Sequence, residues 1–128
     1  MNKEKGNVGE KIAKFFLSKK GFKIISSNYF SRHGEIDIVA VDGGCLVFVE
    51  VKLRKSESIV SGREAVNLNK RKRLIKTALV YISELKKDIQ TRFDVVEING
   101  ISTKDKKAVS VLHLKNAFSL DDVGLIAA

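Results

Sequence analysis

The chain has 128 residues, the length of one domain, and can bury a hydrophobic core without disulfide or metal support. Lys and Arg number 24 against 15 Asp and Glu, and the net charge of +9 favours nucleic acid as a partner, although a merely soluble basic protein has the same composition. The single cysteine, Cys45, excludes an internal disulfide and a zinc finger, and without an apolar membrane span or signal-peptide core we expect a cytoplasmic protein with no membrane role.

Apolar residues at helical spacing predict a first helix from Asn7 to Lys20. Asn7 can cap this helix, and Gly21 is a natural stop after it. The residues that share its apolar arc are Val8, Ile12, Phe15 and Phe16. Phe22 to Phe30 then reads as a strand.

Two clear strands follow a turn at residues 31–34. They run from Glu35 to Val41 and from Cys45 to Leu53, and a Gly43-Gly44 loop between them is typical of a β-hairpin.

A long helix is predicted from Arg63 to Lys87, after a polar stretch at residues 54–62. Its apolar stripe consists of Leu68, Ile75, Ala78, Leu79, Ile82 and Leu85. Four basic residues lie outside that stripe and are expected to face solvent or a ligand: Lys70, Lys72, Arg73 and Lys76.

Phe93 to Ile98 is predicted to be a strand, Lys107 to Leu114 a further one, and the tail from Ser119 has no clear pattern. The order is helix, three strands, helix, strand. We expect the first three strands to form an antiparallel meander, and the long helix to cross over to the next strand of the same sheet. The fold class is therefore mixed α/β. Residues 1–128 are expected to form one domain with a core at about 6–98, extended at 99–128.

The hairpin loop fixes which residues of its two strands face each other. If Gly43 and Gly44 form the loop, Asp42 faces Cys45. The next pairs on the same face are Val41–Leu46, Val39–Phe48, Asp37–Glu50 and Glu35–Lys52. The opposite face is wholly apolar and needs a helix to cover it. That face carries Ile36, Ile38, Ala40, Val47, Val49, Val51 and Leu53.

Two carboxylates, Asp37 and Glu50, are therefore expected to lie opposite each other on a partly apolar face. Like charges in that position repel, and burial either raises their pKa or demands a cation. Mg²⁺ relieves the repulsion, because it accepts one or two carboxylates and fills its shell with water and phosphate oxygens. Glu35 and Lys52 then form a cross-strand ion pair. The alternative is a solvated patch of salt bridges at a sheet edge.

The residues that carry this pattern resemble known nucleases. Asp37, followed after a hairpin by Glu50-x-Lys52, resembles the PD-(D/E)XK signature, and the element order resembles the restriction-endonuclease-like core. More specifically, GNVGEKIAKFFLSKKGFKI, GEIDIVAVD, FVEVKLR and RFDVVEI resemble the YraN-like family of predicted endonucleases, which are similar to archaeal Holliday-junction resolvases. The resemblance covers about Gly6 to Ile98. Ile36 stands where the superfamily carries Pro.

The resemblance implies a role for each matching residue. Asp37 and Glu50 would bind Mg²⁺, with Mn²⁺ as a substitute, helped by the main-chain carbonyl of Val51. Lys52 would orient or activate the attacking water and offset charge on the phosphorane. Glu35 matches the acid of the GEID motif and is counted with the catalytic residues.

Further matches lie on the two helices. Glu10 matches an acid that resolvase-like proteins place near the metal, although spacing alone is equally typical of a solvated glutamate. Lys70 matches a basic position that contacts phosphate, and the dense run NKRKRLIK favours phosphate contacts for its neighbours over a merely solvated helix face. His33 is interpreted as a turn residue, and His113 as structural.

Two functions follow. The first is a metal-dependent endodeoxyribonuclease of resolvase-like type, which acts on branched or duplex DNA and recognises shape rather than sequence. The resemblance to resolvases also implies a two-fold dimer. The alternative is a non-catalytic nucleic-acid-binding protein on the same fold. A pure binder has no need of acids that face phosphate, so the acids at residues 10, 37 and 50 favour the nuclease.

Overall fold

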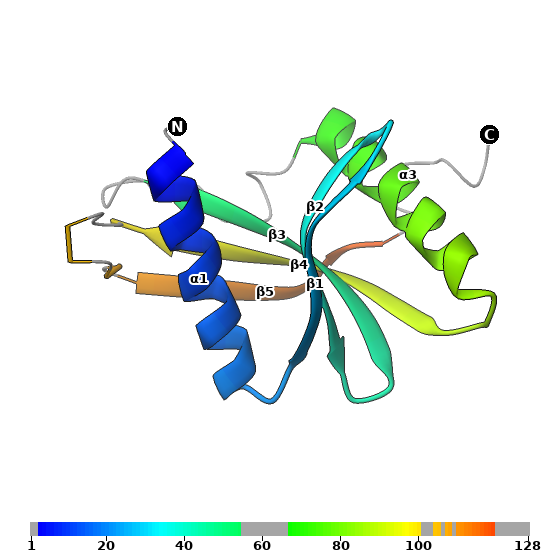
Figure 1. Ribbon diagram of the computed structural model, residues 1–128, viewed down its shortest axis with the longest axis horizontal. Helices are drawn as coiled ribbons and strands as arrows, with labels where there is room; N and C mark the ends of the chain where they lie inside the picture. Colours follow the sequence, from blue (N-terminus) through cyan, green and yellow to red (C-terminus); the bar gives the residue numbers. More distant parts are fainter. Residues whose placement is uncertain (1–2, 55–66, 101–103, 106, 109, 120–128) are drawn as a thin grey trace.

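One mixed five-stranded sheet and two long helices make up the described part of the chain, which is residues 3–54, 67–100, 104–105, 107–108 and 110–119 of the computed structural model (Figure 1). The elements in chain order are α1 (Lys3–Lys19), β1 (Lys23–Ser31), β2 (Gly34–Asp42), β3 (Cys45–Arg54), α3 (Leu68–Leu85), β4 (Gln90–Asn99) and β5 (Ser110–Phe118). The fold class is mixed α/β, as predicted, and the arrangement is consistent with a restriction-endonuclease-like core. Neither helix combines the length and apolar character needed to cross a bilayer.

The sheet has the strand order β1-β2-β3-β4-β5. The first three strands form the predicted antiparallel meander. β4 then runs parallel to β3, in register from Cys45 opposite Gln90 to Arg54 opposite Asn99, and β5 returns antiparallel to β4. A parallel neighbour needs a crossover, and α3 lies in that connection.

The two helices cover opposite faces of the sheet, because alternate residues of β3 pack into different cores. Leu46 and Phe48 belong to the core beneath α3, whereas Val47 and Val49 belong to the core beneath α1. Gly9 allows α1 to approach closely, since a Cβ atom at that position would collide with the Leu53 side chain.

Both helix starts differ from the sequence prediction. α1 begins at Lys3, so Asn7 lies inside the helix and does not cap it. α3 begins at Leu68 because Asn67 has an extended backbone, with φ −71° and ψ 170°, and its side chain accepts a hydrogen bond from the Lys70 N–H. Residues 63–66 of the predicted helix lie outside the described residues.

The buried stripe of α3 is also rotated from the predicted one. Leu68 and Leu79 are exposed, whereas Leu74 and Thr77 are buried. The hydroxyl of Thr77 donates to the carbonyl of Arg73, which allows a polar residue to lie on the core side.

One β2 residue lies on the face opposite to that predicted. Ile36 packs in the α3 core, while Ile38 packs beneath α1, although strict alternation places both on the α1 face. The ladder to β3 ends at Ile38, and Asn28 of β1 takes a left-handed φ of 54° beside this point. The strand bends here, and the bend changes which side Ile36 faces.

The last strand runs from Ser110 to Phe118 instead of from Lys107 to Leu114. Its end is held by the core, since Phe118 is buried and its ring stacks on Phe93 at a centroid distance of 4.9 Å.

Candidate active site

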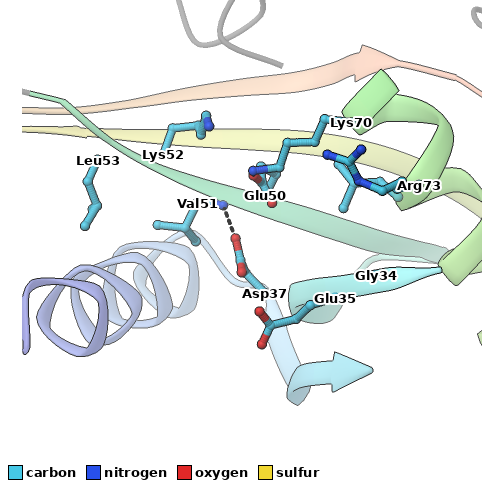
Figure 2. A pocket seen from close by; sticks show the side chains of 10 residues that line it. Gly34, Glu35, Asp37, Glu50, Val51, Lys52, Leu53, Lys70 and Arg73 are labelled. Carbon is cyan, nitrogen blue, oxygen red and sulfur yellow. Dashed lines mark hydrogen bonds and ion pairs between the residues drawn. The ribbon is translucent and has the colours of Figure 1, made fainter. Parts of the chain in front are cut away.

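The predicted hairpin register is confirmed from Asp42 opposite Cys45 to Ile38 opposite Val49. The next two predicted facing pairs, Asp37–Glu50 and Glu35–Lys52, are wrong as ladder pairs because β2 separates from β3 beyond Ile38. In that gap the Asp37 side chain takes the place of backbone pairing: its Oδ2 accepts a hydrogen bond of 2.8 Å from the Val51 N–H (Figure 2).

The gap opens into a pocket of about 430 Å³ between β2, β3 and the start of α3. It is lined by Gly34, Glu35, Asp37, Glu50, Val51, Lys52, Leu53, Lys70, Arg73 and Leu74. Figure 2 shows Asp37 and Glu35 extending from β2, Glu50 and Lys52 on β3, and Lys70 and Arg73 reaching in from α3. The structure therefore brings the predicted acids of the hairpin together with two basic residues of the long helix.

Glu50 lies deep in this pocket, with only 4 % of its surface exposed. The Lys70 ammonium forms an ion pair with its carboxylate. Burial alone would lower the pKa of Lys70, but the charge and hydrogen bond of Glu50 outweigh that effect and raise it. The predicted lysine on β3 behaves differently: burial, followed by the charge of Lys70, lowers the pKa of Lys52.

Asp37 forms no ion pair with a cation among the described residues, although the charge of Lys70 acts on it, and its environment disfavours the ionised form. Burial, followed by the charge and hydrogen bond of Glu50, raises the pKa of Asp37 to about 8, although the Val51 N–H opposes the shift. Glu35 follows the same direction, since burial and then the charges of Glu10 and Glu50 raise its pKa. The pocket lining thus holds three acids and three basic residues, and the acids lie close enough together to disfavour ionisation of Glu35 and Asp37.

Glu10 lies beside the pocket without lining it. Its carboxylate pairs with the Lys14 ammonium at 2.9 Å and accepts hydrogen bonds of 3.0 and 3.2 Å from the Asn28 side chain. Lys72 and Lys76 of α3 also lie outside the lining. His33 stays in the β1–β2 turn, where its N–H donates to the Ser31 hydroxyl.

The donor set of the pocket fits a hard divalent cation. Asp37 and Glu50 supply carboxylate oxygens from adjacent strands, and the carbonyl of Val51, the residue after Glu50, belongs to the same pocket lining. Within the described part of the chain, no three His, Cys, Asp or Glu side chains converge into a complete protein cage. Mg²⁺ does not need one, because it keeps several waters and completes its shell with substrate phosphate oxygens.

A second polar cluster lies on the α1 face of the sheet and was not predicted from the sequence. Asp94 is fully buried and accepts hydrogen bonds from Arg92 Nε at 2.8 Å, Arg92 Nη2 at 3.0 Å and the Asn116 N–H at 2.9 Å. His113 Nε2 lies 2.8 Å from the same carboxylate, and the Lys20 ammonium lies 2.7 Å from His113 Nδ1. Since an ammonium can only donate, Nδ1 accepts and Nε2–H donates to Asp94.

These partners lower the pKa of Asp94, because hydrogen bonds from His113, Arg92 and Asn116 outweigh the opposing effect of burial. The alternation of Arg92 and Asp94 on an otherwise apolar strand was the available sequence signal. Every partner fits a structural role, so His113 is structural in this arrangement.

Comparison with known proteins places the chain among bacterial relatives. Residues 9–98 match the family described as "Uncharacterised protein family UPF0102". A UPF0102 protein of Thermodesulfovibrio yellowstonii is 45 % identical over 115 residues, which cover 90 % of this chain and 96 % of that protein. A UPF0102 protein of Caldanaerobacter subterraneus is 42 % identical, and the match covers 88 % of this chain and 93 % of that protein. A UPF0102 protein of Alkaliphilus oremlandii is 39 % identical, and the match covers 92 % of this chain and 100 % of that protein.

Proposed function

The chain belongs to the uncharacterised protein family UPF0102, which the sequence resemblance identified as YraN-like, and we propose that it is a metal-dependent endodeoxyribonuclease of the PD-(D/E)XK superfamily. One observation carries the proposal. Carboxylates from two separating strands, Asp37 and Glu50, share a pocket with Lys52, Lys70 and Arg73. Acids that repel one another, surrounded by cations, suit a metal ion and a phosphodiester together.

Asp37, Glu50 and the Val51 carbonyl would hold Mg²⁺, or Mn²⁺ in its place. The bound ion would polarise the scissile phosphate and lower the pKa of a water. Lys52 offsets the negative charge that grows on the phosphorane as water attacks, and can orient that water. Lys70 and Arg73 contact phosphate oxygens and hold the backbone in place. Cleavage would leave a 5′-phosphate and a 3′-hydroxyl.

The remaining predicted residues would not bind the metal, and would act through their charge or by contacting DNA. Glu35 adds negative charge at the pocket wall, and Glu10 acts on Glu35 through its charge. Lys72 and Lys76 extend the basic surface along α3 for duplex or branched DNA. We propose recognition of DNA shape, a homodimer that matches paired strands, and a cytoplasmic location.

The test begins with metal binding. Calorimetric titration of Mn²⁺ into the wild-type chain is expected to give one site per chain, and Asp37→Asn is expected to abolish it. Asp88→Asn, at an exposed position outside the pocket lining, is the matched control and retains binding. Equal binding by wild type and Asp37→Asn would remove the metal site from the proposal.

Cleavage is then assayed on branched, linear duplex and single-stranded DNA with Mg²⁺ and Mn²⁺. We expect cleavage of branched or duplex DNA by wild type and none by Asp37→Asn. A wild-type chain that binds metal and DNA but cuts none of these substrates would be a non-catalytic nucleic-acid-binding protein.

A further inference from the structure

The most deeply buried acid of the pocket is already paired with a cation from another element. Lys70 stands in the first turn of α3, and its ammonium contacts Oε2 of Glu50. The Glu50 side chain is 4 % exposed, whereas the Lys70 side chain is 33 % exposed. The carboxylate is therefore fixed in the pocket, and the lysine reaches it from the rim.

The lysine of the sequence motif does not make this contact. Lys52 lies on the same strand as Glu50, yet the ion pair recorded for Glu50 is with Lys70. Lys70 is thus the cation in direct contact with Glu50 in the free protein, whereas Lys52 acts on Glu50 through its charge. Its flexible four-carbon stem allows the ammonium to leave without moving the helix.

We propose that Lys70 competes with the divalent cation for Glu50, and that it moves to a DNA phosphate when the cation binds, so that metal and DNA bind cooperatively. This inference rests on the proposed function. A divalent cation and an ammonium at one carboxylate repel each other, which makes the ion pair a cost to metal binding. A phosphate at the pocket rim offers the released ammonium a new partner, next to Arg73.

The first experiment measures metal alone. Mg²⁺ and Mn²⁺ are titrated into the full chain by calorimetry at pH 8.5, where protons compete little with the metal. Lys70→Met keeps the length of the side chain and removes its charge. Lys87→Met removes the same charge from an exposed position just beyond the end of the same helix, outside the pocket lining. We expect Lys70→Met to bind metal at least about tenfold more tightly than wild type, and Lys87→Met to stay within about twofold.

The second experiment measures transfer of the lysine to DNA. Affinity for a duplex with hydrolysis-resistant phosphorothioate linkages is measured with and without Mn²⁺ at fixed ionic strength. Metal is expected to strengthen duplex binding by a larger factor in wild type than in Lys70→Met, because only wild type gains a freed ammonium. By linkage, the duplex strengthens metal binding by the same factor.

The outcomes separate the two proposals. Equal or weaker metal binding by Lys70→Met, relative to Lys87→Met, overturns the competition while the metal site stands. An equal effect of metal on duplex affinity in wild type and Lys70→Met overturns the transfer. Absence of metal binding in wild type and both variants overturns the proposed function together with this inference. Lys70→Gln repeats each measurement, so that one poorly folded variant does not decide the result.

Discussion

Two aspartates on this sheet show what surroundings do to a carboxyl group. Asp94, on the α1 face, is fully buried and accepts four hydrogen bonds, two of them from the Arg92 guanidinium. Asp37, at the gap between β2 and β3, is half-buried and accepts one hydrogen bond from a backbone N–H. The pKa of Asp94 is lowered, and the pKa of Asp37 is raised to about 8.

The difference shows that burial by itself does not make an acid functional. Donors from β4 and β5 satisfy Asp94, so its charge stabilises the fold. Glu50 and Glu35 lie near Asp37 and disfavour its ionised form, and the Lys70 ammonium pairs with Glu50 instead, so the charge of Asp37 is only partly compensated. An acid that the protein leaves partly uncompensated is available for an external cation, and one that is fully paired is not.

The largest expected effect is on stability. Asp94→Asn removes the charge that pairs with Arg92 inside the protein, and should lower the free energy of unfolding by about 3–5 kcal/mol. Asp37→Asn removes a buried carboxyl whose ionised form is disfavoured beside Glu50, and should raise that free energy. Urea unfolding followed by circular dichroism at pH 7 measures both. A loss below about 1 kcal/mol for Asp94→Asn would contradict the structural role of the Asp94 cluster.

The next effect is on catalysis. Lys52→Ala should slow DNA cleavage by roughly 10²-fold, which corresponds to about 2.7 kcal/mol of transition-state stabilisation. DNA affinity should stay within a few-fold, because one phosphate contact among many is small. Lys115→Ala, beside Asp42 and far along the sheet from the pocket lining, is the control and should cut at the wild-type rate. Equal cleavage by Lys52→Ala would place the chemistry outside this motif.

The two aspartates should also give opposite pH dependences of stability. The raised pKa of Asp37 makes folding favourable at low pH, and this contribution is lost as pH rises from about 4 to about 8. The lowered pKa of Asp94 stabilises the folded protein at pH values above about 4, the ordinary pKa of an aspartate, and this stabilisation is lost as the pH falls below that value.

Unfolding free energies of wild type and Asp37→Asn between pH 4 and 8 test the first half of this comparison. As pH rises through this range, the free energy of unfolding of Asp37→Asn should increase relative to that of wild type by up to about 1.4 kcal/mol per pH unit. Parallel curves for the two proteins would show that Asp37 is ionised throughout this range. Measurements below pH 4 test the second half, where Asp94→Asn should lose less stability than wild type.

The smallest effect concerns DNA affinity. Replacing Lys70, Lys72 and Arg73 by Ala should weaken duplex binding and flatten its dependence on log[salt] by up to about one unit per lost phosphate contact. The matched control replaces by Ala three exposed lysines near the end of the sheet that carries the β2–β3 loop: Lys19, Lys23 and Lys115. That variant should keep the wild-type slope. The reverse result would move the DNA to the surface near the Asp94 cluster.

The amino-acid sequence by itself determined the hairpin of β2 and β3 and the meander it belongs to. Period-two alternation and the Gly43-Gly44 loop fix the register from Asp42 to Ile38, because both act over a few neighbouring residues. The same local pattern gathered Glu35, Asp37, Glu50 and Lys52 at one end of the hairpin, and these four side chains line one pocket.

Only the tertiary structure decided where that pairing stops and which partners the acids take. β2 bends away from β3 at Asp37. The bend turns Ile36 toward the α3 face of the sheet, and it lets the Val51 N–H donate a hydrogen bond to the Asp37 carboxylate. The ion pair between Lys70 and Glu50 joins residues twenty positions apart, and the Asp94 cluster joins β4 to β5. Such contacts depend on how separate segments pack, and local periodicity carries no information about the distance between segments.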